Sequence, residues 1–182
     1  MNKQYEMVKD FQTKMGQPVA GRPTVMGIKR MQERFVYLEE ELNEFAVAET
    51  VVDQADAMID LIYLAIGTLV ELGVQPEKLF EIVHNANMSK LWEDGKPRTN
   101  PETGKIIKPP TFVRPEPLLQ KEIERQSTFW IDAVSRYFPE VTKQEIEFIL
   151  WEKTAYPLGS AATVEQQLKD LKDEIEAKSE TK

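Results

Sequence analysis

The sequence predicts an all-α fold, a helical bundle with a helical extension at its C-terminal end. Three observations support this prediction. Apolar residues recur every three or four positions through most of the 182 residues, as they do on one face of a helix. Proline and glycine stand where these periodic segments stop. No stretch of useful length alternates apolar and polar residues as a strand does.

Four helices are expected in the first half of the chain. The first is amphipathic and ends before Gly16, and a turn follows it over residues 16–24. Gly73 is a favourable stop for the third helix, and Pro76 suits the first turn of the fourth. The second, third and fourth helices are expected over about residues 25–49, 51–72 and 76–90. The apolar stripe of the second helix consists of Ile28, Met31, Phe35, Leu38, Leu42 and Phe45.

Residues 91–117 have a different composition. They hold six prolines and two glycines, which predicts a long loop of the kind that is often functional or disordered. From Lys90 to Arg114 there are six basic and three acidic side chains, a net charge of +3 in an otherwise acidic chain. We therefore expect a first domain over residues 1–115 and a C-terminal extension over residues 118–182. The extension should hold helices at about 118–138, 142–154 and 164–178.

The composition of the chain argues against several classes of function. The formal net charge is −8, which disfavours a nucleic-acid-binding surface. There is no cysteine, so disulfides and thiolate metal sites are excluded and a reducing compartment fits. The first residues are too polar for a secretory signal, and the longest apolar run is about half of what a bilayer span needs. We therefore expect a cytoplasmic protein with no nucleic-acid partner and no membrane partner.

Two clusters of carboxylates are the strongest functional signal. One lies on the second helix and the other on the third, and each falls within an arc of about 100° or less around its helix. Their members are Glu40, Glu41 and Glu44, then Asp53, Asp56 and Asp60. If the two helices are antiparallel neighbours, these arcs can face each other and hold a divalent cation. The alternative is a pair of solvated acidic faces, which are common on helices.

Asp60 favours the cation over the solvated faces. The segment Leu61–Val70 that follows it is apolar on nearly every side, so it should be a helix buried all round. A carboxylate where such a helix enters the core is costly unless it is paired or bound to a metal. Oxygen ligands favour Mg²⁺ or Mn²⁺ over zinc. His84 is the one histidine, so we interpret it as a partly buried helix residue and expect no zinc or di-iron site.

The chain resembles the all-α nucleoside triphosphate pyrophosphohydrolase superfamily over about residues 5–115. This superfamily includes MazG-like proteins, dimeric dUTPases and phosphoribosyl-ATP pyrophosphohydrolase, and the sequence looks most like its small MazG-like, "Cof-like" branch. The family motif is Glu-x-x-Glu, a spacer, and Glu-x-x-Asp. Glu41 and Glu44 fit the first half and Asp60 fits the end of the second. The later segment Asn87-Met88-Ser89-Lys90 and the Gly104-Lys105 pair add to the resemblance.

One position departs from the motif. Ala57 stands where the family carries the first Glu of Glu-x-x-Asp, so that ligand is missing. Asp56 is adjacent to Ala57, and Asp53 lies about one helical turn before it on nearly the same face. Either side chain could substitute.

The resemblance implies hydrolysis of a (deoxy)nucleoside triphosphate, such as dUTP or dCTP, to the monophosphate and pyrophosphate. It implies a homodimer or a larger homo-oligomer. The implied ligands of Mg²⁺ or Mn²⁺ are Glu41, Glu44, Asp56 and Asp60, and the catalytic carboxylates are Glu40, as the base, and Glu41. The implied substrate-binding residues are Asn87, Lys90, Lys105 and Lys108, with Arg98 as a further candidate.

Two other interpretations follow from the same sequence. Phe11 and Trp92 could stack on a base, although packing in the core is the expected role of Phe11. The missing acid at Ala57 suggests, as an alternative, a helical interaction or regulatory module that has lost the chemistry. In that case residues 118–182 would form the partner surface, instead of packing against the first domain.

Overall fold

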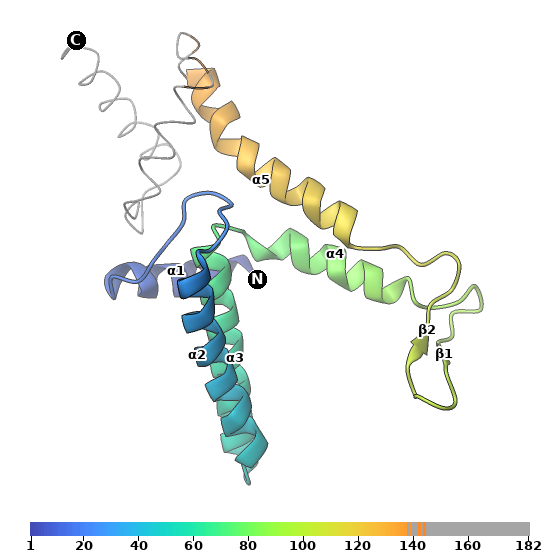
Figure 1. The fold of residues 1–182 in the computed structure, drawn as a ribbon. Coiled ribbons are helices and arrows are strands. Elements are labelled where there is room, and N and C mark those ends of the chain that lie inside the picture. Colours follow the sequence, from blue (N-terminus) through green and yellow to red (C-terminus); the bar gives the residue numbers. More distant parts are fainter. Residues whose placement is uncertain (138, 140–141, 143, 145–182) are drawn as a thin grey trace, which may run out of the picture.

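The computed structural model describes residues 1–137, 139, 142 and 144. The second and third helices expected in the extension fall outside this part, apart from 142 and 144. Five helices occur in the described part, and they confirm the all-α fold. They are α1 (Asn2–Lys14), α2 (Ile28–Val47), α3 (Val51–Glu71), α4 (Pro76–Met88) and α5 (Glu116–Tyr137). Figure 1 shows their arrangement.

A short β-hairpin corrects the expectation of a loop without strands. Strands β1 (Arg98–Thr99) and β2 (Ile106–Ile107) pair antiparallel between α4 and α5. The turn between them is closed by the side chain of Asn100, whose oxygen accepts hydrogen bonds from the backbone of Glu102 and Thr103. Strands of two residues are too short to leave a periodic pattern in the sequence.

The core lies where α1 crosses the C-terminal half of α3 (Figure 1). Its buried side chains are Tyr5, Val8, Val19, Ile66 and Val70. Burying one such side chain contributes about 1.5–3 kcal/mol. The loop after α1 is tied to the end of α3, because the amide of Ala20 donates to the carbonyl of Val70 (3.1 Å) and that of Thr24 to Leu72 (2.9 Å).

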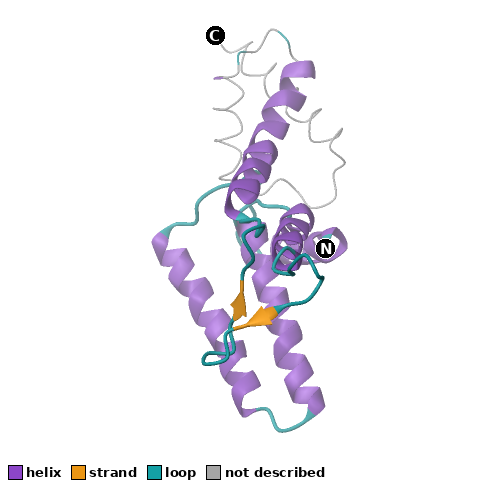
Figure 2. Cartoon of the chain, turned by 90° about the vertical axis from the view of Figure 1, so that its right-hand side faces the viewer, coloured by secondary structure: helices purple, strands orange, loops and turns teal. Residues whose placement is uncertain are grey.

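Helices α2 and α3 form an antiparallel hairpin that extends away from this core (Figure 1), and Figure 2 shows them side by side. Only residues 48–50 separate the two helices. Thr50 caps α3, since its Oγ1 accepts a hydrogen bond from the amide of Asp53 (3.1 Å) and donates to the carboxylate of Asp53 (2.6 Å). This cap starts α3 immediately after α2 ends.

The chain bends by 116° between α3 and α4. Gly73 makes the bend, because its φ of +65° is strained for other residues and an added Cβ would lie 2.1 Å from the carbonyl oxygen of Arg22. Helix α4 then packs against α5, where the Gln126 side chain bonds to both the amide (2.9 Å) and the carbonyl (3.2 Å) of Gln75. The result is that α4 points away from the α2–α3 hairpin (Figure 1).

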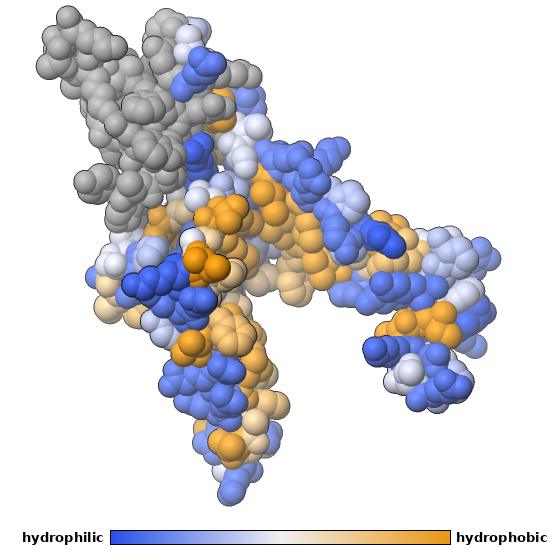
Figure 3. Space-filling model, viewed as in Figure 1, coloured by the Kyte–Doolittle hydropathy of each residue, from blue (hydrophilic) through white to orange (hydrophobic). Residues whose placement is uncertain are grey.

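The prediction that residues 61–70 are buried all round is wrong for the isolated chain. Ile66 and Val70 are buried, but Ile62 is 50% exposed and Tyr63 36%. The apolar stripe of α2 is likewise open, with Phe35 62% and Leu42 51% exposed. The reason is the course of α4, which leaves the outer faces of the hairpin without a neighbour among the described residues. Figure 3 shows apolar surface along both the hairpin and α4.

Within the described part of the chain, no single helix is long and apolar enough to cross a membrane. One bent pair, α3 with α4, meets the length and composition that a span requires.

Candidate active site

The predicted acidic residues gather in the outer half of the α2–α3 hairpin. Glu40, Glu41 and Glu44 come from α2, and Asp56 and Asp60 come from α3. We call these five residues the acidic tip. Glu41 is half-buried and the other four are exposed. The short loop after α2 brings the two sets together, because it lets α3 run antiparallel beside α2.

Glu41 lies at the centre of the acidic tip. Burial raises the pKa of the Glu41 carboxyl, and the negative charges of Glu44, Asp60, Glu40 and Asp56 raise it further. One of its oxygens, Oε2, is buried without a hydrogen-bond partner. Buried carboxylate oxygens are normally paired, so Glu41 has an unfilled bonding capacity that a cation or a proton would satisfy.

The side chains of the acidic tip are not arranged as a complete metal-binding site. Among the described residues, no group of three or more His, Asp or Glu side chains is already placed to hold one ion. The carboxylates lie close enough to affect the pKa of Glu41, but their oxygens do not converge on one point.

Asp53 and Asp56, the two candidates for the acid missing at Ala57, lie in different surroundings. Ala57 is buried (3% exposed), in the stretch of α3 that packs along α2. The Asp53 carboxylate is engaged by the hydroxyl of Thr50. Asp56, in contrast, is one of the charges that raise the pKa of Glu41. We interpret Asp53 as a capping residue and Asp56 as the member of the tip.

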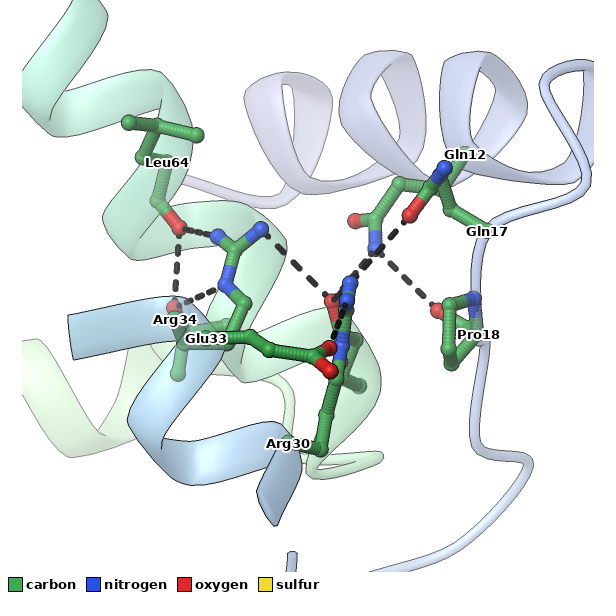
Figure 4. A network of polar contacts seen from close by, with 9 residues as sticks. Gln12, Gln17, Pro18, Arg30, Glu33, Arg34 and Leu64 are labelled. Carbon is green, nitrogen blue, oxygen red and sulfur yellow. Dashed lines mark hydrogen bonds and ion pairs between the residues drawn. The ribbon is translucent and has the colours of Figure 1, made fainter. Parts of the chain in front are cut away.

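At its other end the hairpin contains a polar network that the sequence analysis did not identify (Figure 4). We call it the base network; it consists of Gln12, Arg30, Arg34 and Glu71. Arg30 donates two hydrogen bonds of 2.8 Å to the carboxylate of Glu71, and Nη1 of Arg34 lies 3.6 Å from the same carboxylate. The Glu71 side chain is only 2% exposed. Arg34 stands at helical spacing between Met31 and Leu38, and an arginine within an apolar stripe could have signalled this role.

The predicted phosphate-binding residues lie elsewhere. Asn87 is near the end of α4, and Nζ of Lys90 donates a hydrogen bond of 2.7 Å to its side-chain oxygen. Lys105 and Lys108 are exposed residues of the β-hairpin region, and the ammonium of Lys108 lies 4.4 Å from the ring centre of Phe112. Because α4 points away from α2 and α3, one chain does not bring these cations to the acidic tip (Figure 1).

Three further expectations have outcomes here. His84 is exposed, so its interpretation as a partly buried residue is wrong. Phe11 is 44% exposed and packs edge-on against Tyr63, with ring centres 5.7 Å apart, so it is at the margin of the core and not within it. The guanidinium of Arg98 covers one face of Trp92 at 3.9 Å, which leaves that face closed to a nucleobase.

Comparison with known proteins supports the class that the fold and the acidic tip indicate. Residues 8–87 match the family model of phosphoribosyl-ATP pyrophosphohydrolase, and this match supports a relation to the all-α nucleoside triphosphate pyrophosphohydrolase superfamily. The matched segment runs from α1 through most of α4 and includes the whole acidic tip. It supports pyrophosphohydrolase activity in general as the class of function.

A solved structure is also similar in sequence. It is a proposed NTP pyrophosphohydrolase from Exiguobacterium sp. 255-15, with 29% identity, which covers 68% of this chain and 95% of that one at a TM-score of 0.41. No curated protein matches the chain.

Proposed function

We propose that the protein hydrolyses a (deoxy)nucleoside triphosphate to the monophosphate and pyrophosphate, with Mg²⁺ or Mn²⁺, and so clears nucleotides such as dUTP or dCTP from the pool. The observation that carries the proposal is the crowding of four carboxylates around the half-buried Glu41, within the segment that matches the family model. Crowded carboxylates repel one another, and a divalent cation relieves this repulsion.

The residues of the acidic tip fit a hard divalent cation. They supply only carboxylate oxygens, and Oε2 of Glu41 is buried without a partner. Glu41, Glu44, Asp56 and Asp60 would hold the ion, which when bound lowers the pKa of water and neutralises phosphate charge. Glu40 is exposed beside them and would take the proton from the attacking water, as a general base.

The substrate phosphates need positive charge where the leaving pyrophosphate gathers negative charge. Lys90, Lys105 and Lys108 would provide it, and Asn87 would hydrogen-bond a phosphate or the sugar. The contact between Lys90 and Asn87 supports a joint role, since it holds the ammonium at the end of α4.

The protein would act as a homodimer or a larger homo-oligomer. The course of α4 keeps its own Lys90 away from its own acidic tip, and the apolar side chains of Phe35, Leu42 and Ile62 are half exposed or more. A second copy laid against the hairpin would cover these side chains and would bring its own α4 to the tip. Each site would then combine the tip of one subunit with the cations of another.

Identification of the products tests the chemistry. Purified protein would be incubated with a panel of deoxynucleoside triphosphates and Mg²⁺ or Mn²⁺, and the products separated by ion-exchange chromatography. We expect monophosphate and pyrophosphate in equal amounts, and loss of both in Glu41→Gln but not in Glu39→Gln. Diphosphate with inorganic phosphate, or no turnover of any nucleotide, would contradict the proposal.

Mixing two inactive variants tests the shared site. Glu41→Gln and Lys90→Met would be unfolded and refolded together at equal concentration. Random pairing gives half heterodimers, and each heterodimer holds one intact site, so activity should return to about a quarter of the wild-type value. Sites built within one chain would give no recovery.

A catalytically impaired interaction or regulatory module is the alternative function. The specific observations in its favour are the missing acid at Ala57 and the absence, within the described residues, of a ready group of three metal-binding side chains. Such a module would bind Mg²⁺ weakly or not at all and would release no pyrophosphate.

A further inference from the structure

Arg34 makes an unusual contact with α3. Its Nε donates a hydrogen bond of 3.0 Å to Oγ1 of Thr68, and its Nη2 donates to the backbone carbonyl of Leu64. Oγ1 of Thr68 in turn donates to the same carbonyl at 3.0 Å. The Arg34 side chain is 8% exposed and therefore joins α2 to the backbone of α3 inside the protein (Figure 4).

The sequence of α3 leaves room for this contact at Gly67. A Cβ at this position would lie 3.0 Å from Nη2 of Arg34 and 3.1 Å from Oε1 of Gln12. A glycine inside a helix costs about 1 kcal/mol relative to alanine, so its presence there has a packing reason. The Gly67-Thr68 pair thus forms the receptor for Arg34.

The contact is placed where it can control the acidic tip. Arg34 and Glu41 are seven residues apart, two turns along the same face of α2, and Leu64 and Asp60 are one turn apart on α3. Between this contact and the tip loop, in residues 35–60, Ala57 alone is buried. The outer half of the hairpin therefore has almost no buried apolar core of its own. Among the described hydrogen bonds between the two helices, those of Arg34 lie nearest to the tip apart from the bond of Gln54 to Ala48 at the loop.

We propose that Arg34 is a positioning residue that fixes the spacing and register of α2 against α3, so that the carboxylates of the acidic tip face one another. Its consequence for cation binding rests on the function proposed above. The presence of an arginine at position 34 supports a positioning role, because a buried arginine contributes less to stability than an apolar side chain of similar volume. Its planar fork can engage a hydroxyl, a carbonyl and a carboxylate at once, which lysine cannot.

The spacing can be measured without metal or substrate. The natural chain has no cysteine, so Asn43→Cys and Ala55→Cys provide a unique pair of exposed label sites on the two helices of the outer hairpin. Nitroxide labels on this pair report the distance between the helices by dipolar broadening in EPR spectra. Labelled chains are diluted with unlabelled ones, so that distances between subunits do not contribute.

We expect Arg34→Met and Thr68→Val to shift or widen the label distance relative to the parent. Thr68→Ser, which keeps the hydroxyl, should behave like the parent. Arg30→Met is the matched control, because Arg30 also pairs with Glu71 but does not contact the carbonyl of Leu64. All spectra are taken at low temperature on protein whose helical content equals that of the parent, and Thr68→Val replaces Arg34→Met if the latter does not fold. A parent-like distance in both variants would overturn the proposal.

Mn²⁺ affinity gives the functional readout. Free Mn²⁺ measured by EPR should show about tenfold weaker binding in Arg34→Met and no change in Arg30→Met, since loss of residues that orient ligands typically costs this much. Unchanged affinity despite an altered label distance would overturn the link to the tip. If the parent protein bound no Mn²⁺, the proposed function would fail, while the label distances would still decide whether Arg34 positions the helices.

Discussion

The two ends of the α2–α3 hairpin differ in how their charged side chains are paired. In the base network, the buried carboxylate of Glu71 accepts hydrogen bonds from Arg30 and lies beside Arg34. In the acidic tip, Glu41 has four negative neighbours, and its buried Oε2 has no hydrogen-bond partner. Paired charge at one end is satisfied within the protein, and unpaired charge at the other end keeps bonding capacity for a ligand. Four substitutions break or sharpen this contrast.

Glu71→Gln should have the largest effect on stability. The change leaves two arginine charges without their buried partner, and breaking a buried pair in this way costs about 3–5 kcal/mol. The free energy of unfolding, measured in urea, checks this value. Glu33→Gln is the matched control, because Glu33 is 40% exposed and pairs with Arg30 at the surface, where a salt bridge contributes about 0–1 kcal/mol. Equal costs for the two variants would contradict the buried pairing.

Gly67→Ala should destabilise the protein by about 1–3 kcal/mol, since the new methyl group would press on Arg34 and Gln12. The sign of the change in unfolding free energy distinguishes the two effects, because helix propensity alone would make alanine more stabilising than glycine by about 1 kcal/mol. Urea unfolding again gives the measurement. A stabilised variant would show that Arg34 does not need the space above Gly67.

Glu41→Gln should stabilise the metal-free protein, in contrast to the two changes in the base. Removal of the central negative charge relieves repulsion from its four neighbours. We expect a rise of about 2 °C in the thermal midpoint for a chain of this size. Glu39→Gln removes an exposed charge from the same helix that is not among those acting on Glu41, and it should leave the midpoint nearly unchanged. A lower midpoint for Glu41→Gln would mean that its carboxylate already has a stabilising partner.

Two carboxyl groups should give opposite dependences of stability on pH. The pKa of Glu41 is raised by burial and like charges, so its stabilising contribution is present at low pH and is lost as pH rises through the raised pKa. The pKa of Glu122 is lowered by hydrogen bonds from Arg125, so its contribution is present near neutral pH and is lost as pH falls through the lowered pKa. The free energy of unfolding of wild type, Glu41→Gln and Glu122→Gln is measured from pH 3 to 7. The difference between wild type and each variant gives the contribution of that carboxyl group at each pH. Contributions that change with pH in the same direction would contradict the assignment.

The sequence predicted the helices well, because their ends are marked locally. The second helix was expected over 25–49 and runs over Ile28–Val47, and Thr50 and Gly73 mark the ends of α3. The exposure of α3 could not be predicted, since it depends on the direction that α4 takes after the 116° bend, and periodicity along one helix does not contain this information. The β-hairpin was missed because its strands are two residues long.

The candidate site likewise has features that could be predicted from the sequence and features that could not. The grouping of Glu40, Glu41, Glu44, Asp56 and Asp60 on the hairpin could be predicted from their spacing, because residues on one face of a helix come together without regard to the rest of the fold. The contact of Arg34 with Gly67 and Thr68 was not predicted. Their roles depend on a contact across two helices, with only a charged residue in an apolar stripe and a glycine inside a helix as signals.

Titration of the metal-free protein with Mg²⁺ or Mn²⁺ in a calorimeter tests the central claim, that the acidic tip is a cation-binding catalytic site, most directly. Wild type and Glu39→Gln should give binding isotherms with the same dissociation constant, and Glu41→Gln should show binding about tenfold weaker or none. Equal binding by Glu41→Gln and wild type would place the ion elsewhere. No heat from the wild type would contradict the account and favour a module that has lost its chemistry.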